Sequence, residues 1–391
     1  MGVDLFFVLS GFVITMTYCD SVGPRFSGRI ARSFLWARIS RVWPVHALVA
    51  TLFGGWLLWK STKVTDGNVA YQSVQPELDL PHLVEQLLMV QLWHRPSYQG
   101  ASFAGPAWSL SAEWLAYVCF PLVALVLWRL RHARPAVTGA LAITALLPMA
   151  LLSVADGGLG FGWSWLLRIA GGFLSGAFAS LTVRRIAPSA RAGRAATTVA
   201  TATVAAIVVG LWWADWRGAG SAAGNGGAVA FLFPVLVGSL ALAGGGPARL
   251  LGTRAMVLGG RISFALYLVH VPVFEIFWTE MGWHPRIAPD TRLSLLLMPV
   301  VLLGTLLLAH LMFRFVEEPA RRWLRRHEPG AGRSAAAGGV PADPVPTEPR
   351  QTLVLLRVPR HPAASAAART VRTVRAPKGA ADRGPAVLGN G

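Results

Sequence analysis

Glu113 is an acidic residue inside an apolar stretch, and hydroxyl groups lie on both sides of it along the chain. Ser109, Glu113 and Tyr117 are four residues apart, so they share one face of a helix. A carboxylate inside a membrane helix costs roughly 2.5–3.5 kcal/mol, and a functional role is therefore its default interpretation. A carboxylate among hydroxyls can accept a proton from an alcohol or orient one. We predict Glu113 as a catalytic residue with Ser109 beside it. No Gly-x-Ser-x-Gly surrounds Ser109, so a covalent serine is disfavoured.

Two more charged residues lie near the starts of apolar runs. Asp4 is in the first run and Arg168 is in a later one, and we place both at the depth of Glu113, in the outer half of a helix bundle. Buried charges are normally paired. We therefore expect Asp4, Glu113 and Arg168 to share one polar pocket that binds substrate. The alternative is a structural ion pair that fixes how the helices pack.

His270 lies halfway along another apolar run, 262–279. Ser263 and Tyr267 precede it by seven and three residues, a spacing that puts all three on one helical face. We expect this face to line the same pocket. His270 is then a second candidate for the catalytic base, and Ser263 and Tyr267 are substrate-binding residues.

Arg38 and Arg41 lie three residues apart in ARISRVWPVH (37–46). We expect the second apolar run to begin at Pro44, because proline is tolerated in the first turn of a helix. Two guanidinium groups on one side of a short helix can bind a phosphate bidentately. The alternative is that they only set the topology. His46 is either a proton carrier or a packed, hydrogen-bonded residue.

The composition is that of a polytopic membrane protein. Of the 391 residues, 54% are hydrophobic and 14% charged, whereas soluble domains carry about 25% charged residues. The net charge of +18 comes from basic residues between apolar runs, so we ascribe it to the positive-inside pattern and expect no nucleic-acid partner. Cys19 and Cys119 suggest neither a disulfide framework nor a metal site.

Nine apolar runs approach spanning length, which predicts an all-α transmembrane bundle. They are 3–19, 44–59, 107–128, 136–153, 164–182, 196–213, 227–245, 262–279 and 293–315. Every second junction between runs is basic and the others are mixed in charge, which fits nine spans with the basic loops in the cytoplasm. The short run 83–93, which contains Glu85, is expected to be interfacial or re-entrant.

The two ends of the chain differ from the bundle. The loop charges place Met1 on the outer face, and an upstream helix running outward is the simplest way to insert such a chain. Beyond residue 326 the sequence is rich in Ala, Gly, Pro and Arg without helical periodicity. We therefore expect a transmembrane domain over 1–326 and a disordered, basic, cytoplasmic tail over 327–391.

Five segments, in this order, resemble the acyltransferase 3 family of integral membrane O-acyltransferases. They are GVDLFFVLSGFVI (2–14), ARISRVWPVH (37–46), AWSLSAEWLAYVCFP (107–121), GRISFALYLVHVPV (260–273) and FRFVEEPARRWL (313–324). The resemblance covers about residues 2–326 and is far more specific than any one motif. It implies ten transmembrane helices in a bacterial plasma membrane, and no bound cofactor. An acyl-CoA donor, usually acetyl-CoA, would enter from the cytoplasmic side.

The implied reaction moves an acyl group to a hydroxyl of a carbohydrate or glycoside, such as an envelope polysaccharide or a macrolide. The resemblance maps the family's arginine pair onto Arg38 and Arg41, and its Ser-x-x-x-Glu element onto Ser109 and Glu113. It also maps family positions onto Asp4, Arg168, Ser263, Tyr267 and His270.

One departure from the family pattern concerns the N-terminus. Family members carry a helix before Gly-Val-Asp with an arginine and a histidine thought to be essential, and this helix is missing before Met1. We expect a mis-assigned start, and we expect little activity from a chain that truly begins at Met1. In the complete site that histidine would be the base, and Glu113 would orient it or the acceptor.

Two other interpretations stay open. A carrier or flippase could use the same charged pocket, and a truncated chain could be an inactive scaffold. The pattern specifies no oligomeric state.

Overall fold

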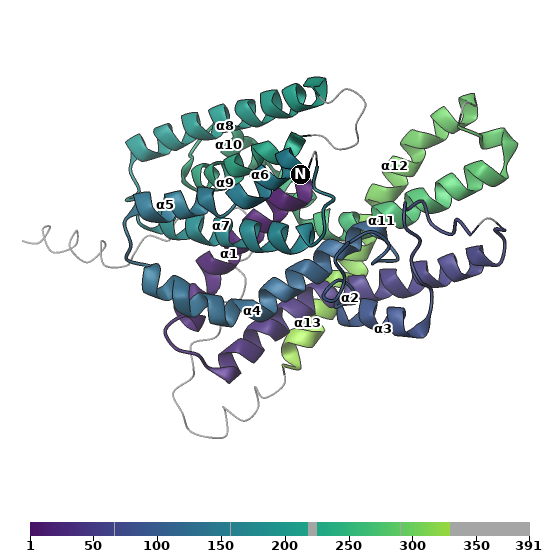
Figure 1. The fold of residues 1–391 in the computed structure, drawn as a ribbon, viewed down its shortest axis with the longest axis horizontal. Coiled ribbons are helices and arrows are strands. Elements are labelled where there is room, and N and C mark those ends of the chain that lie inside the picture. The colour runs from purple at the N-terminus through teal and green to yellow at the C-terminus, as the bar shows by residue number, and fades with distance from the viewer. Residues whose placement is uncertain (66, 157, 218–224, 290, 329–391) are drawn as a thin grey trace, which may run out of the picture. The chain divides into compact units, whose positions relative to one another are not determined.

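A computed structural model of the chain describes residues 1–65, 67–156, 158–217, 225–289 and 291–328. Within these ranges the regular elements are all helices, which confirms the predicted all-α fold (Figure 1). The α-helices are α1 (Gly2–Val22), α2 (Gly28–Ser61), α3 (Leu80–Leu88), α4 (Trp108–Leu130), α5 (Pro135–Thr144), α6 (Leu147–Ala155), α7 (Ser164–Arg184), α8 (Ala190–Arg217), α9 (Phe233–Leu242), α10 (Pro247–Leu251), α11 (Arg254–Trp283), α12 (Arg292–Met312) and α13 (Glu318–Arg326). Short 3₁₀ segments are η1 (Gly105–Ala107), η2 (Asn225–Leu232) and η3 (Pro285–Ile287), and η4 (Phe313–Glu317) is a π-helix. The predicted tail lies almost wholly outside the described residues.

Eight helical segments of the described chain are long and apolar enough to cross a bilayer. They are α1, α2, η1 with α4, α5 with α6, α7, α8, α11, and α12 with η4 and α13. Each contains one of the predicted runs. The protein is therefore a polytopic membrane protein, as the composition indicated.

The run 227–245 differs from the prediction. Nine spanning helices were expected, whereas eight helical segments of the described chain meet the criterion of length and hydropathy. The apolar helical part of this run, Val229–Leu242, is shorter than a spanning helix. The segment is divided between η2 and α9, and Pro234 lies in the first turn of α9, where its missing N–H does no harm. The segment still returns along α8, because Gly210 packs against Val229 while Gly246 packs against Thr197.

The second predicted run is also longer than expected. α2 has 34 residues, about 50 Å at 1.5 Å per residue. Pro44 lies inside α2 and not in its first turn, so the expected start of the span at Pro44 was wrong. Proline is tolerated inside membrane helices because neighbouring groups satisfy the freed carbonyl. Arg38 and Arg41 consequently belong to the same continuous helix as the span. The run 83–93 overlaps only the nine-residue helix α3, which covers Leu80–Leu88.

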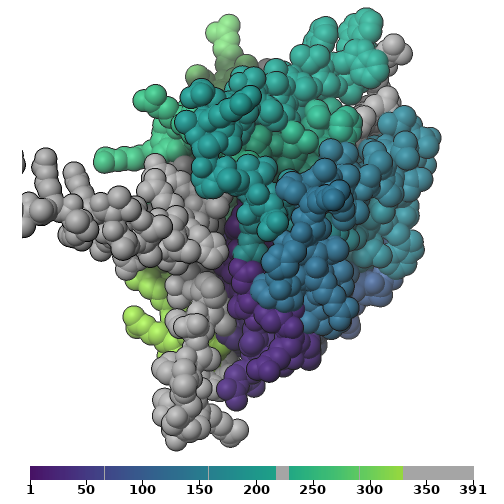
Figure 2. Space-filling view, turned by 90° about the vertical axis from the view of Figure 1, so that its left-hand side faces the viewer, coloured from purple at the N-terminus to yellow at the C-terminus, as the bar shows by residue number. Residues whose placement is uncertain are grey.

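α1 and α7 make the closest helix pair and lie side by side (Figure 1). A Cβ atom on Gly11 would lie 2.0 Å from the Phe173 carbonyl oxygen, and one on Gly176 would lie 1.8 Å from the Val8 oxygen. Small residues let membrane helices approach in this way, since lipid supplies little hydrophobic drive for their association. In Figure 2, purple residues of the N-terminal part lie against blue and teal residues from the middle of the chain.

The ends of the helices meet as the alternating loop charges require. At the end with mixed-charge loops, Arg168 at the start of α7 bonds Asp4 at the start of α1. At the basic end, Arg184 of α7 forms an ion pair with Asp20 of α1. The Trp36 indole near the start of α2 also donates to the Leu324 carbonyl of α13, at 2.8 Å. Helix ends assigned to one side of the membrane from sequence therefore lie together.

An aromatic core joins the first helices to α4 and α7. The Phe34 ring lies 5.1 Å from that of Tyr18 and 5.0 Å from that of Phe120, and Phe120 lies 6.0 Å from Phe173. Phe34, Phe120 and Tyr18 are at most 1% exposed. This packing fixes the rotation of α4, which carries Glu113.

Candidate active site

Glu113 is buried, with 3% of its surface exposed, and two hydroxyls converge on one of its oxygens. Ser10 of α1 donates to Oε1 across 2.7 Å, and Tyr117, one turn later on α4, donates to the same atom. Within the described chain, Oε2 receives no hydrogen bond. The carboxylate is thus held by two donors and keeps one oxygen for another partner. Sequence spacing predicted the Tyr117 side of this arrangement but not Ser10, a single hydroxyl in an apolar run.

Arg38 lies behind this carboxylate, on the side of the basic helix ends. It is 4% exposed, its Nη2 donates to the Tyr18 hydroxyl at 3.1 Å, and its guanidinium lies over the Tyr18 and Tyr117 rings at 5.3 and 6.0 Å. The half-buried Arg41 lies three residues further along α2. Both arginines are close enough to act on Glu113 electrostatically. Arg38 therefore belongs to the interior of the bundle.

Asp4 and Arg168 form a bidentate ion pair. The Arg168 Nε and Nη2 atoms donate to Oδ1 and Oδ2 of Asp4 at 2.7 and 3.1 Å, and both residues are buried. The guanidinium also lies 4.8 Å from the Trp108 ring and 6.0 Å from the Tyr98 ring. Two parallel hydrogen bonds and two aromatic rings occupy this arginine, which ties the starts of α1, α4 and α7 together.

Ser109 contacts α11 instead of Glu113. Its hydroxyl lies 2.8 Å from that of Tyr267, and the Tyr267 hydroxyl donates to the Pro106 carbonyl at 2.7 Å. A cavity of about 440 Å³ lies beside Tyr267, between α11 and α12. Ser263, Tyr267 and His270 all line it, together with leucines of α12. The three residues predicted to share a face therefore do share one.

The expected single pocket is divided into three neighbouring groups. Glu113, Ser10, Tyr117 and Arg38 form one group, Asp4 and Arg168 form the second, and the third lies along α11. His270 Nδ1 lies 2.7 Å from the Tyr267 carbonyl of its own helix, and His270 makes no described contact with Glu113. Tyr267 connects the groups. Its hydroxyl forms a hydrogen bond with Ser109, and it is close enough to Arg168 and Glu113 to interact with them electrostatically.

His46 is a packed residue. It is 1% exposed, and its Nε2 lies 2.8 Å from the Gln86 carbonyl oxygen. This contact holds α3 against α2. Of the two interpretations for His46, the structure shows the hydrogen-bonded one.

Three side chains with metal-ligating atoms meet at the surface, although the sequence suggested no metal site. Ligand atoms of Glu77, Asp79 and His82 lie within 4.8 Å of one another. Asp79 caps α3 by accepting from the His82 backbone N–H at 2.9 Å. Hydrogen bonds from the backbone and side chain of His82 lower the pKa of Asp79. Arg95 Nη2 lies 2.6 Å from His82 Nε2. The contacts of this cluster are those of a helix cap.

Sequence reasoning passed over a buried ion pair, Lys60 with Glu275. Lys60 Nζ lies 3.3 Å from Glu275 Oε1, and the two side chains are 5% and 3% exposed. The signal was present, because Glu275 is an acidic residue in the apolar segment VPVFEIFW. The rule that singled out Glu113 applies equally to Glu275.

Comparisons with known proteins place these groups in context. A protein-family model described as an acyltransferase domain, that of the acyltransferase 3 family, matches residues 1–314. Acyltransferase MdmB of Streptomyces mycarofaciens is 30% identical over 123 residues, which are 31% of this chain and 27% of MdmB. The chain thus matches about a quarter of the length of this relative. No solved structure matches the chain.

Proposed function

The chain belongs to the acyltransferase 3 family, and we propose that it transfers an acyl group, most simply acetyl, from coenzyme A to a hydroxyl of a carbohydrate or glycoside. The protein is thus a membrane acyltransferase. The observation that carries the finer proposal is the buried Glu113 carboxylate, held by two hydroxyls and flanked by Arg38. Glycans of the cell envelope and macrolide-type glycosides are the proposed acceptors.

The polar groups follow one another through the bundle. Arg38 and, one turn further along α2, Arg41 lie on the side of the basic helix ends, Glu113 with Ser10 and Tyr117 follows, and Ser109 with Tyr267 lies nearest the opposite end. We assign the arginines to the phosphates of the donor, since guanidinium groups bind phosphate bidentately. The acyl thioester would then meet the acceptor near Glu113. Because the basic loops are assigned to the cytoplasm, the donor would enter from the cytoplasmic side.

The reaction needs a base and a positioned alcohol. The acceptor oxygen forms a bond to the thioester carbonyl carbon, the C–S bond breaks, and the acceptor proton ends on the coenzyme A thiol. Glu113 orients the acceptor hydroxyl, or the base that takes its proton, through Oε2. His270 is the second candidate for that base. General acid–base help of this kind contributes about 10²–10⁴-fold in rate.

The test uses membranes from cells that express the natural gene product. They are supplied with [¹⁴C]acetyl-CoA and with envelope glycans or macrolide glycosides. We expect alkali-labile radiolabel on an acceptor and one free thiol for each ester formed. Release of thiol without ester, or movement of glycan across sealed vesicles without thiol release, would contradict the proposal. Movement without thiol release would favour a carrier.

A further inference from the structure

A second cavity, of about 600 Å³, lies where the C-terminal ends of α2 and α11 meet the connection between α2 and α3. Buried Lys60 and Thr279 line it, and Tyr71, Ser73 and Trp283 are exposed lining residues. Its volume is within the range of small-molecule sites, which are about 300–1,000 Å³. None of the groups already assigned to the transfer reaction lines this cavity.

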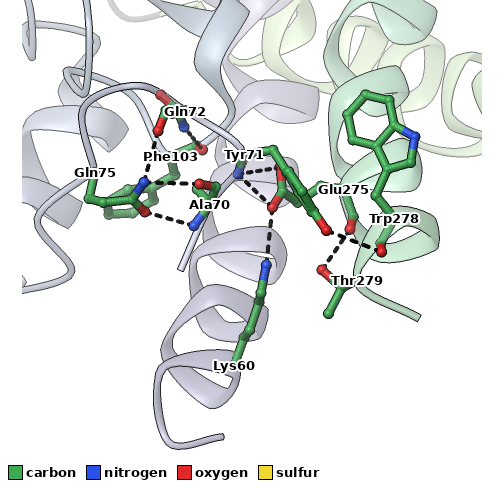
Figure 3. A network of polar contacts seen from close by, with 9 residues as sticks. All are labelled: Lys60, Ala70, Tyr71, Gln72, Gln75, Phe103, Glu275, Trp278 and Thr279. Carbon is green, nitrogen blue, oxygen red and sulfur yellow. Dashed lines mark hydrogen bonds and ion pairs between the residues drawn. The ribbon is translucent and has the colours of Figure 1, made fainter. Parts of the chain in front are cut away.

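The wall of this cavity is held by the Lys60–Glu275 ion pair (Figure 3). The Tyr71 backbone N–H donates to both oxygens of Glu275, at 2.9 and 3.0 Å, and Lys60 Nζ lies 5.0 Å from the centre of the Tyr71 ring. The Tyr71 hydroxyl donates to the Trp278 carbonyl at 3.2 Å. One carboxylate therefore fixes the loop, the end of α2 and α11 at once, so the cavity has a defined shape.

The charges of this cavity cancel. The Lys60 ammonium is matched by the Glu275 carboxylate, and the other polar lining groups are amides and hydroxyls. Partial burial, and then the Glu275 carboxylate, raise the pKa of Tyr71, which keeps its hydroxyl neutral at physiological pH. Among the described lining residues, a phosphate or carboxylate ligand would meet no cation other than the already paired Lys60. A neutral, hydroxyl-rich ligand can use the amides and hydroxyls, with Tyr71 and Trp283 supplying aromatic surface beside them.

The cavity is joined to the candidate active site through Gln72. This lining residue donates from Nε2 to the carbonyls of Ser102 and Phe103, at 3.2 and 3.0 Å. Those carbonyls lie two and three residues before η1, whose Pro106 carbonyl accepts from Tyr267. Along α11, Thr279 lies twelve residues beyond Tyr267, about 18 Å at 1.5 Å per residue. A ligand in the cavity would therefore need several linked rings to reach Tyr267 and Ser109.

We propose that this cavity binds the neutral sugar portion of the acceptor. The bound sugar holds the acceptor in place while the reactive hydroxyl of the acceptor reaches the Ser109–Tyr267 end of the site. The inference rests on the proposed function, because it supplies that reaction with its acceptor. It assigns the donor and the acceptor to opposite ends of the bundle.

The test compares steady-state constants of the native protein with those of Trp283→Ala and Ser73→Trp, using [¹⁴C]acetyl-CoA and the neutral glycoside that the native protein acetylates. Trp283→Ala removes aromatic surface, and Ser73→Trp adds bulk at an exposed position. We expect both variants to raise the acceptor KM at least tenfold and to leave the donor KM unchanged. Trp212→Ala, a 68% exposed tryptophan on α8, is the matched control.

The outcomes separate the two proposals. No transfer by the native protein contradicts the proposed function itself. Transfer by the native protein with an unchanged acceptor KM in Ser73→Trp overturns the cavity assignment and leaves the function standing. A raised donor KM in both variants would assign the cavity to the donor, which also overturns the inference.

Discussion

Ser10 of α1 donates a hydrogen bond to Glu113 of α4 across 2.7 Å inside the bundle. The carboxylate of one helix is therefore positioned by a hydroxyl of another. Tyr117 bonds the same oxygen, so the orientation of Glu113 depends on two residues that need not touch substrate.

Ser10→Ala and Tyr117→Phe should each slow acyl transfer. A hydrogen bond to a charged group is worth about 1.5–3 kcal/mol, which corresponds to roughly 10- to 150-fold in rate if it is lost in the transition state. We expect the fall in kcat with little change in either KM, and a shifted pH–rate profile, which a purely structural role would not produce. Ser239→Ala is the control, since that buried serine bonds only its own helix. Unchanged profiles in both variants would argue against positioning.

Asp4→Asn and Arg168→Gln should each destabilise the bundle. Removing one partner of a buried pair costs about 3–5 kcal/mol, because the other charge is left uncompensated. The double variant should lose less than the sum of the two single losses. Unfolding of the purified protein in mixed micelles measures these free energies. Strictly additive losses would show that the pair contributes nothing as a pair.

The cap of α3 should respond to acid. The pKa of Asp79 is lowered in the folded chain by hydrogen bonds from His82, so its stabilising effect is fully present above the unfolded value of about 3.9. The effect is lost as the pH falls through the lower folded value. The protection factors of the α3 amides against hydrogen exchange, which correct for the intrinsic effect of pH on the exchange rate, should therefore fall at about pH 3 relative to pH 6. Asp79→Asn should abolish this dependence, because asparagine caps without titrating. An equal fall of the protection factors in Asp79→Asn would show that the Asp79 cap is not the cause.

The basic loops should all lie on the cytoplasmic side. Reporter fusions after Arg25 and after Arg134 should report the cytoplasm, and a fusion after Lys63 should report the opposite side, in line with the distribution of basic residues. Fusions after Arg25 and after Arg134 that report different sides would break the alternation. A cytoplasmic signal after Lys63 would do the same.

The sequence predicts the features that depend on the residues of a single helix or segment. Periodicity gives the shared face of Ser263, Tyr267 and His270, and the pairing of buried charges anticipates the contact of Asp4 with Arg168. Hydropathy predicts the all-α fold. The distribution of charge in the loops predicts which helix ends lie together. These features follow from spacing within one segment or from the solvation cost of a charge.

The remaining features depend on how helices are rotated against each other, which spacing does not encode. Ser109 contacts Tyr267 and not Glu113, and the donor to Glu113 from another helix is Ser10. Pro44 concealed the continuity of α2, and with it the inward position of Arg38. The helical part of the run 227–245 is shorter than predicted because hydropathy does not distinguish a 3₁₀ segment from an α-helix.

The most direct test of the central claim is acyl transfer by Glu113→Gln, measured with [¹⁴C]acetyl-CoA beside Glu280→Gln, a partly exposed carboxylate at the end of α11. Glutamine keeps the volume and removes the charge, and both variants are compared at equal amounts of folded protein in the membrane. We predict a loss of at least about 100-fold in kcat for Glu113→Gln, as expected for a missing acid–base group, and native rates for Glu280→Gln. Native rates in Glu113→Gln would contradict the account.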